Sequence, residues 1–204
     1  MALNSYSALK DSVAAWLNEA DLATRIPDFI ALAEAVINRR VDHRRMIGVA
    51  TLGFSADRAA LPDDFTAVRA VRIDSNAMPR LDFMTLDAYA ARATSESGPP
   101  QRYALGGAYM LFDPPASAPM TATLIYSRRI DPLSEAGGNW LLEAFPDAYL
   151  YGALTAAAPY VEDADRAATW AQLFEKALNE INADGQSQSF GGTLQTDNGQ
   201  ARIF

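Results

Sequence analysis

Apolar residues recur at three- and four-residue steps near the end of the chain, and this spacing predicts a helix with one buried face. The apolar positions are Ala167, Trp170, Phe174, Ala177, Leu178 and Ile181. Asp163 is a suitable N-cap, and Asp184-Gly185 is a suitable end because glycine is favoured just after a last helical turn. The stretch before it, from Asn139, is apolar on nearly all sides. Together the two stretches predict an antiparallel helical hairpin that turns at residues 161–163.

Two further helices are expected within residues 1–48. Ser5 is a suitable N-cap for the first, which should run to about Asn18, and Pro27 suits the first turn of the second. The apolar positions are Tyr6, Leu9, Val13, Trp16 and Leu17 in the first helix, and Phe29, Ile30, Ala33, Val36, Ile37 and Val41 in the second. We expect the second helix to end near Gly48, which would place several basic residues in its last turns.

The pattern changes between residues 49 and 134 to short apolar segments separated by turn residues, which is typical of small antiparallel strands. Expected strands are 49–54, 67–73, 80–83 and 121–127, with a turn at 61–65. Thr85 is a suitable cap for a short helix to about Arg92. Residues 102–112 predict a hairpin whose strands meet at Gly106-Gly107, a pair suited to a tight two-residue turn.

Residues 185–204 are rich in glycine, serine, glutamine and threonine, with few apolar side chains. Such a segment buries too little surface to order itself, so we expect a flexible arm. Its candidate docking residues are Phe190, Leu194, Arg202, Ile203 and Phe204. Two interpretations stay open for the arm, a frayed terminus or a ligand for a partner surface.

These segments predict an α+β protein. Residues 1–48 and 135–184 should form a helical bundle, in which the C-terminal hairpin completes the N-terminal helices. Residues 49–134 should form a small antiparallel β-rich lobe inserted into that bundle, and residues 185–204 an extended C-terminal arm.

The amino-acid composition excludes several classes of function. The chain has no cysteine, which excludes disulfides, thiolate metal sites and a cysteine nucleophile. No apolar run approaches the roughly 18–20 residues of a membrane span, so no membrane partner is expected. The net charge of −8 argues against a general nucleic-acid binder, because such proteins normally carry a basic face.

Catalytic and ligand-binding motifs are also missing from the sequence. The single histidine, His43, lies among arginines with no serine or acid at a catalytic spacing. Gly106-Gly107 is followed by an expected strand rather than a helix, so it is no phosphate-binding loop. We therefore expect no enzyme activity, no cofactor and no metal site.

Two charged sets are candidates for contacts. The basic set is Arg39, Arg40, His43, Arg44 and Arg45. Three readings of it stay open: cations that complement a helix C-terminus, a contact with an acidic partner or neighbouring subunit, and a small DNA-binding module. The acidic set is Glu162, Asp163, Asp165, Glu175 and Glu180. It could face solvent or contact a partner.

The order of these segments resembles the head–tail adaptor, or head-completion, proteins of tailed bacteriophages. The resemblance rests on SYSALKDSVAAWLN and DLATRIPDFIALAEAVINRRVDHRRM, then ALPDDFTAVRAVRID, the Gly-Gly hairpin PQRYALGGAYMLFDPPA, and the closing hairpin from Asn139. It covers roughly residues 5 to 183 and would equally suit a phage-like particle such as a gene transfer agent.

The resemblance implies a structural virion protein at the neck, made in the cytoplasm of the bacterial host. Such proteins form a ring, expected to be a dodecamer, beneath the portal protein. The ring completes the DNA-filled head and presents a surface to a tail, nozzle or stopper protein. Double-stranded DNA passes through the ring without specific binding, and the acidic set could line that channel and repel the DNA. The resemblance also makes the C-terminal arm a candidate for docking on the portal.

The apolar stripe of the last helix makes Trp170→Ala an informative change. If the indole is buried in the hairpin, we expect a loss of about 3–5 kcal/mol in the free energy of unfolding, measured by urea titration. A loss below about 1 kcal/mol would show that Trp170 lies on the solvent face of the helix.

Overall fold

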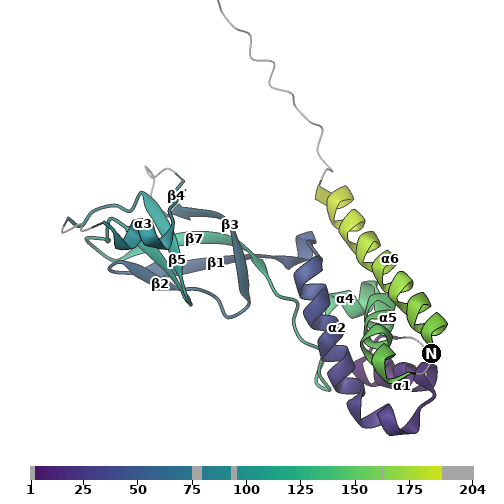
Figure 1. Ribbon diagram of the computed structural model, residues 1–204. Helices are drawn as coiled ribbons and strands as arrows, with labels where there is room; N and C mark the ends of the chain where they lie inside the picture. Colours follow the sequence, from purple (N-terminus) through teal and green to yellow (C-terminus); the bar gives the residue numbers. More distant parts are fainter. Residues whose placement is uncertain (1–2, 75–79, 93–95, 162, 190–204) are drawn as a thin grey trace, which may run out of the picture. The chain divides into compact units, whose positions relative to one another are not determined.

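A computed structural model describes residues 3–74, 80–92, 96–161 and 163–189, and it divides into two compact units (Figure 1). Unit 1 is Met1–Arg44 with Asp131–Phe204, and unit 2 is Arg45–Ile130. The described part of unit 1 is built from helices, and unit 2 is built mainly from antiparallel strands. The predicted α+β fold class is confirmed.

Unit 1 is organised around one central helix. Its helices are α1 (Tyr6–Leu17), the 3-10 helix η1 (Ala20–Arg25), α2 (Ile26–Arg40), α4 (Trp140–Ala144), α5 (Pro146–Ala157), the 3-10 helix η3 (Ala158–Tyr160) and α6 (Ala164–Ser189). Helix α5 packs against α1, α2, α4 and α6. Because α5 is apolar on nearly all sides, it is stable only when other helices cover every face.

Gly152 is the point of closest approach in this bundle. A Cβ atom at this position would lie 2.8 Å from the Cβ of Ala33 on α2 and 3.0 Å from the ring of Phe174 on α6. The first distance is shorter than Cβ atoms tolerate and the second is tight, so glycine lets α2 and α6 pack closely onto α5 at this level.

The core of unit 1 also contains a chain of polar contacts. The Tyr149 hydroxyl on α5 is fully buried and accepts a hydrogen bond from Asn139 Nδ2 at 2.7 Å. The same hydroxyl donates to Glu34 Oε1 at 3.4 Å, which also accepts from the Leu133 amide at 2.8 Å. Burial raises the pKa of the Glu34 carboxyl, and it raises the pKa of the Tyr149 phenol. These contacts join α2, α4 and α5 with the segment that precedes α4.

The N-cap residues predicted from the sequence cap helices in the structure. The side chains of Ser5 and Asp163 accept hydrogen bonds from backbone amides three residues later, at 3.2 and 3.0 Å. Thr85 does the same for α3 (Leu86–Ala90) of unit 2. The buried positions of α6 are Trp170, Phe174, Ala177, Leu178 and Ile181. The predicted apolar stripe of α6 is therefore confirmed, with Ala167 only partly buried.

The first half of the predicted hairpin is broken into two helices. Helix α4 ends at Ala144, Phe145 leaves the helical region with φ −136° and ψ 61°, and α5 begins at Pro146. A residue before proline is disfavoured in helical geometry, and proline lacks the amide that would continue the hydrogen-bond pattern. The continuous run of apolar residues hid this break.

Helix α2 ends at Arg40, and the expected end near Gly48 was wrong. Asn182 of α6 explains the early end. Its Nδ2 atom donates to the Arg40 carbonyl at 3.2 Å, and its Oδ1 atom accepts from the Asp42 amide at 2.8 Å. One side chain thus replaces helical hydrogen bonds on both sides of Val41, which is extended.

The predicted end of α6 at Asp184-Gly185 was also wrong, because the helix continues to Ser189. Gly185 is needed for close approach rather than for a cap. A Cβ atom there would lie 3.0 Å from the Asp42 carbonyl oxygen and 3.1 Å from the Cα atom of His43. The chain leaving α2 therefore passes directly over this glycine of α6.

Unit 2 contains two small sheets. Their strands are β1 (Ile47–Phe54), β2 (Arg58–Ala60), β3 (Phe65–Ile73), β4 (Asp82–Phe83), β5 (Arg102–Gly106), β6 (Tyr109–Asp113) and β7 (Met120–Arg128). The three-stranded sheet has the order β1-β7-β3 and the four-stranded sheet the order β2-β6-β5-β4. All neighbours are antiparallel except β4 and β5, which are parallel.

The two sheets share one apolar core. At its centre the rings of Phe54, from β1, and Phe112, from β6, stack with centroids 4.0 Å apart. The three-stranded sheet also contributes Leu52, Val71, Ile73, Ala122, Leu124 and Tyr126 to this core. The alternate residues of the same strands face outward.

The Gly-Gly hairpin forms with its turn displaced by one residue from the prediction. Gly106 pairs with Tyr109 as the last strand position, so the turn residues are Gly107 and Ala108. Gly107 has φ +60°, a conformation that glycine adopts without strain. Strand β2 was not predicted, because three residues are too few to carry an alternating pattern.

The contact at Gly152 generates a stability prediction. Gly152→Ala should lower the free energy of unfolding by about 1–3 kcal/mol, because the added methyl group overpacks the junction of α2, α5 and α6. Helix propensity alone would raise stability by about 1 kcal/mol. The matched control is Gly138→Ala, whose Cβ would meet only ordinary contacts at 3.8 and 3.9 Å. Gain of stability in Gly152→Ala, measured by urea unfolding, would contradict the packing argument.

The raised pKa of Glu34 generates a pH prediction. The folded protein holds this proton to a higher pH than the unfolded chain does, so Glu34 lowers stability as pH rises from the usual range of a glutamate through its folded pKa. In Glu34→Gln the amide oxygen can accept both existing hydrogen bonds without a charge. We expect the difference in unfolding free energy, variant minus native, to grow between about pH 4 and pH 7.

Glu143→Gln provides the control for this experiment, because it removes an exposed carboxylate that is not part of the Glu34 contacts. A flat difference for Glu34→Gln would show that burial does not perturb this carboxyl.

Candidate interaction surfaces

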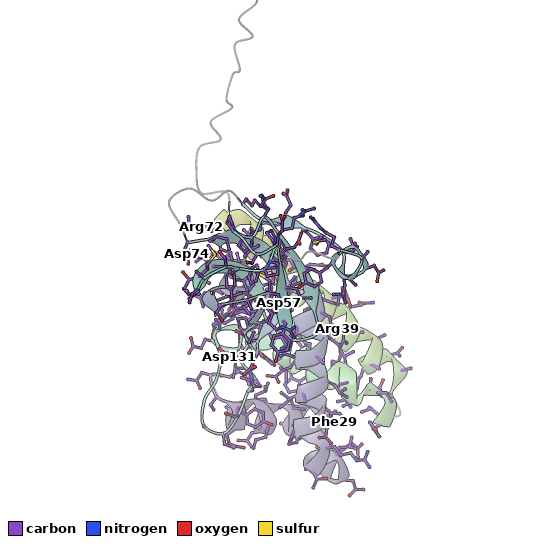
Figure 2. The ribbon with its side chains drawn as sticks, turned by 90° about the vertical axis from the view of Figure 1, so that its left-hand side faces the viewer. Phe29, Arg39, Asp57, Arg72, Asp74 and Asp131 are labelled. Atoms are coloured by element: carbon purple, nitrogen blue, oxygen red, sulfur yellow. The ribbon has the colours of Figure 1, made fainter. Side chains whose placement is uncertain are left out.

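The basic set at residues 39–45 does not form one free patch. Arg39 and Arg40 lie in the last turn of α2, where Figure 2 labels Arg39, and both are exposed. Arg40 forms a two-pronged ion pair with Glu175 of α6, in which Nη2 lies 2.6 Å from Oε2. This hydrogen bonding lowers the pKa of the Glu175 carboxyl. Arg40 therefore holds α2 against α6.

His43 is a core residue, so its assignment to an exposed contact set was wrong. Its side chain is 2% exposed and stacks on Trp140 with ring centroids 4.7 Å apart. Its Nε2 atom lies 3.1 Å from Asp184 Oδ2. Only the tertiary structure reveals this, because Trp140 and Asp184 are far away in the sequence.

Arg44 and Arg45 begin the 3-10 helix η2 (Arg44–Met46) and are exposed. Each also takes part in an interaction within the chain. Among the described residues, Arg40, Arg44 and Arg45 of this segment each take part in an interaction within the chain.

The acidic set is also largely engaged within unit 1. Asp163 caps α6, Glu175 pairs with Arg40, and Glu180 lies 3.7 Å from Lys176 one turn earlier. Asp165 is exposed. Glu162 lies outside the described residues, as do the arm residues Phe190, Leu194, Arg202, Ile203 and Phe204. Paired carboxylates repel DNA weakly, which reduces the case for α6 as an acidic channel lining.

The charged groups buried in unit 2 are structural. Asp113 is 2% exposed, and its Oδ2 atom lies 2.8 Å from Arg92 and 3.3 Å from Arg102. The two arginines neutralise this carboxylate where the strands of the four-stranded sheet end. The described residues contain no cluster of three or more His, Cys, Asp or Glu side chains suited to a metal ion.

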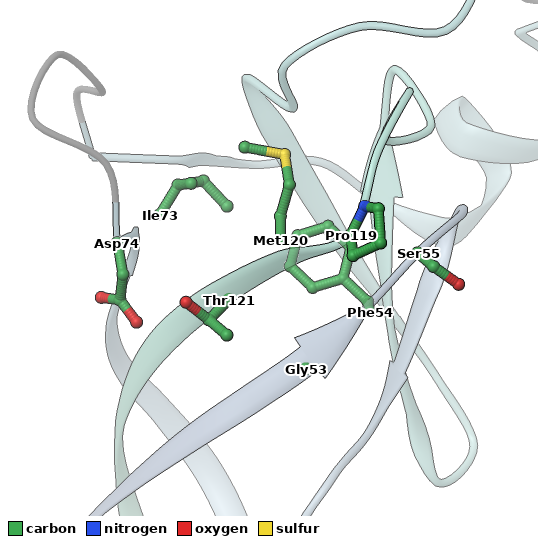
Figure 3. A pocket seen from close by; sticks show the side chains of 8 residues that line it. All are labelled: Gly53, Phe54, Ser55, Ile73, Asp74, Pro119, Met120 and Thr121. Carbon is green, nitrogen blue, oxygen red and sulfur yellow. The ribbon is translucent and has the colours of Figure 1, made fainter.

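A hollow of about 640 Å³ opens at one end of the three-stranded sheet (Figure 3). Its lining residues are Gly53, Phe54, Ser55, Ile73, Asp74, Pro119, Met120 and Thr121. Asp74 is the one charged residue among them. The lining offers a few polar groups but no pair of acid and base, so we assign it no chemistry.

The outer face of the same sheet carries a feature that the sequence analysis missed. Arg72 of β3 forms a β-bridge with Arg80, and both side chains line a hollow of about 440 Å³ with Thr123 and Ile125. The charged positions Arg69 and Arg72 and the apolar positions Val71 and Ile73 were visible in the sequence. The sequence did not show that Arg80 lies opposite Arg72, because the expected strands 67–73 and 80–83 do not by themselves indicate which positions pair.

Comparison with known proteins identifies the family. The family model described as SU10 adaptor protein matches residues 4–197. The match therefore spans both units and reaches eight residues beyond the end of α6 at Ser189. None of the curated proteins matches the chain. Within the part of the chain that the structure describes, no helix is long and apolar enough to cross a membrane. Because the match covers nearly the whole chain, this protein belongs to the SU10 adaptor family, a family of phage adaptor proteins.

Proposed function

We propose that this protein is a neck adaptor that binds beneath the portal protein of a phage or phage-like particle. Copies of the chain assemble into a ring, with twelve copies expected, that completes the DNA-filled head. The other side of the ring receives a tail, nozzle or stopper protein, and double-stranded DNA passes through without specific binding. The match of the adaptor family to residues 4–197 is the observation that carries this proposal.

The geometry of α6 supports a docking role for the segment that follows it. Helix α6 is anchored at its C-terminal part by Asn182, Asp184 and Gly185, which all contact the chain leaving α2. A force on the segment after Ser189 would therefore act on a fixed helix rather than on a fraying one. The family match includes the first part of that segment, to residue 197.

Charge is consistent with a structural role beside DNA. The chain has 17 basic and 25 acidic residues, and this excess of acid opposes tight binding of a duplex. The arginines at 40, 44 and 45 already interact within the chain, which weakens the competing reading of a DNA-binding module.

The direct test is to mix the purified protein with the portal protein of its own genome. Light scattering and negative-stain imaging should show a complex that is larger than the portal alone, with a ring added at one end. Two proteins that remain separate at micromolar concentrations would contradict the proposed function.

Truncation after Ser189 tests the role of the arm. Because residues 190–204 follow the anchored end of α6, their removal should leave the helical circular dichroism and the unfolding midpoint unchanged. Binding to the portal should weaken by at least about tenfold, which corresponds to about 1.4 kcal/mol. Titration of labelled portal by fluorescence anisotropy measures this loss. An internal replacement of Gln172 by Ala, on the exposed side of α6, is the control.

Unchanged portal affinity in the truncated protein would remove the arm from the portal interface. That outcome would not decide the adaptor role itself, which the mixing experiment tests.

A further inference from the structure

The outer face of the three-stranded sheet is arranged in regular rows across β1, β7 and β3. One row consists of Val49, Ile125 and Ala70, which are paired across the strands. The next row consists of Thr51, Thr123 and Arg72, and the bridge from Arg72 to Arg80 extends it. An apolar row thus lies directly beside a polar row that ends in two arginines.

The apolar row is open to solvent. Val49 is 70% exposed and Ile125 is 37% exposed, although both lie in the middle of regular strands. Ile47, in the row beyond Val49, is also 37% exposed. Strand residues of this type normally pack against something, so this face has the composition of the centre of a protein contact.

The two arginines at the end of the polar row are close but unneutralised. Arg72 and Arg80 are paired in this bridge, and like charges on directly paired strand positions destabilise a sheet. Neither the Arg72 nor the Arg80 side chain forms an ion pair or hydrogen bond with the residues that the structure describes. An external anionic group between them would offset the repulsion and accept several hydrogen bonds.

The neighbouring polar groups limit what such a group could be. Thr123 Oγ1 donates to Asp74 Oδ1 at 2.6 Å, and Figure 2 labels Arg72 and Asp74 on the same strand end. Arg69 Nε donates to Ser127 Oγ at 2.9 Å on the same face. The face therefore carries three cations and one anion beside an apolar row. This mixture suits a protein surface with carboxylates, since a DNA backbone would leave the apolar row unmatched.

Charge complementarity points to a second copy of this chain as the occupant. Unit 1 contains 17 acidic and 8 basic residues, a net charge of −9, whereas unit 2 contains 8 acidic and 9 basic residues, a net charge of +1. Exposed carboxylates on the helices of unit 1 include Asp11, Asp28, Glu143 and Asp165. A second copy can therefore offer the helical surface and the carboxylates that this sheet face lacks.

We propose that the outer face of β1, β7 and β3 is the subunit interface, and that it receives the acidic helical unit of a neighbouring copy, with carboxylates seated at Arg72 and Arg80. The contact joins two different surfaces, which is the kind of interface that closes into a ring. This inference rests on the proposed ring, because a chain that never assembles beside another copy has no use for the contact.

The test places a photo-crosslinking amino acid at Val49, where the exposed position leaves the core intact. The protein is irradiated in two states: bound to the portal protein, and free at a concentration of about 1 mM. We expect a cross-link from position 49 to a helix of unit 1 in a second copy, identified by mass spectrometry of an isotope-mixed sample.

Charge reversal then tests the arginines. Arg72→Glu and Arg80→Glu should each lower the yield of this cross-link by about tenfold, because a reversed charge repels the carboxylates. Arg58→Glu is the matched control, since Arg58 is an exposed arginine on the other sheet whose ion pair, among the described residues, is with its sequence neighbour Asp57. Its yield should stay within about twofold of the parent. All variants should retain the unfolding midpoint of the parent protein.

The possible results separate this inference from the proposed function. A portal complex whose position-49 cross-link goes to the portal, to DNA or to no second copy overturns the interface and leaves the adaptor role intact. Absence of a portal complex, with the cross-link between copies present in the concentrated protein, overturns the adaptor role and supports the interface. Equal yields in the Arg72, Arg80 and Arg58 variants overturn the assignment of the arginines.

Discussion

Burial of α5 on every side is the constraint on which unit 1 depends. A helix that is apolar all round has no solvent face, so it must be surrounded. Its neighbours come from both parts of the chain, with α1 and α2 before unit 2 and α4 and α6 after it. Unit 2 is therefore an insertion, and its two connections must leave the bundle without exposing the α5 core. The contacts at Gly152 show how closely α2 and α6 pack against α5.

Both connections are held at unit 1 by a polar side chain. Asn182 bonds to the backbone on either side of Val41 as the chain leaves α2, and Glu34 accepts from the Leu133 amide where the chain returns. Buried or partly buried backbone groups need such partners. Because Glu34 also accepts from Tyr149, the returning connection is tied directly to α5. Helix α5 thus holds the helices that surround it and also one of the two connections to unit 2.

Local signals in the sequence predicted the helix starts, most strands and the buried stripe of α6, because caps and apolar spacing act over a few residues. The break between α4 and α5 has a local cause, Pro146, but two other wrong boundaries have distant causes. The end of α2 depends on Asn182, and the continuation of α6 through Gly185 depends on contact with Asp42 and His43. His43 was grouped with the arginines as a contact candidate because it lies among them in the sequence, while its partners Trp140 and Asp184 are remote in sequence. The Arg72–Arg80 bridge was missed although the two residues are close in sequence, because strand signals do not show which positions pair.

The charge of the chain is divided unequally between the units, and this limits how copies can meet. Two acidic helical units repel one another, whereas a helical unit and a sheet face attract. At physiological salt this attraction extends only about 8 Å, so it can orient an approach but cannot hold two copies together. Lasting contact needs apolar surface at the same place. Val49 and Ile125 supply that apolar surface beside Arg72. One sheet face therefore carries both the charges that orient a partner and the apolar surface that holds it.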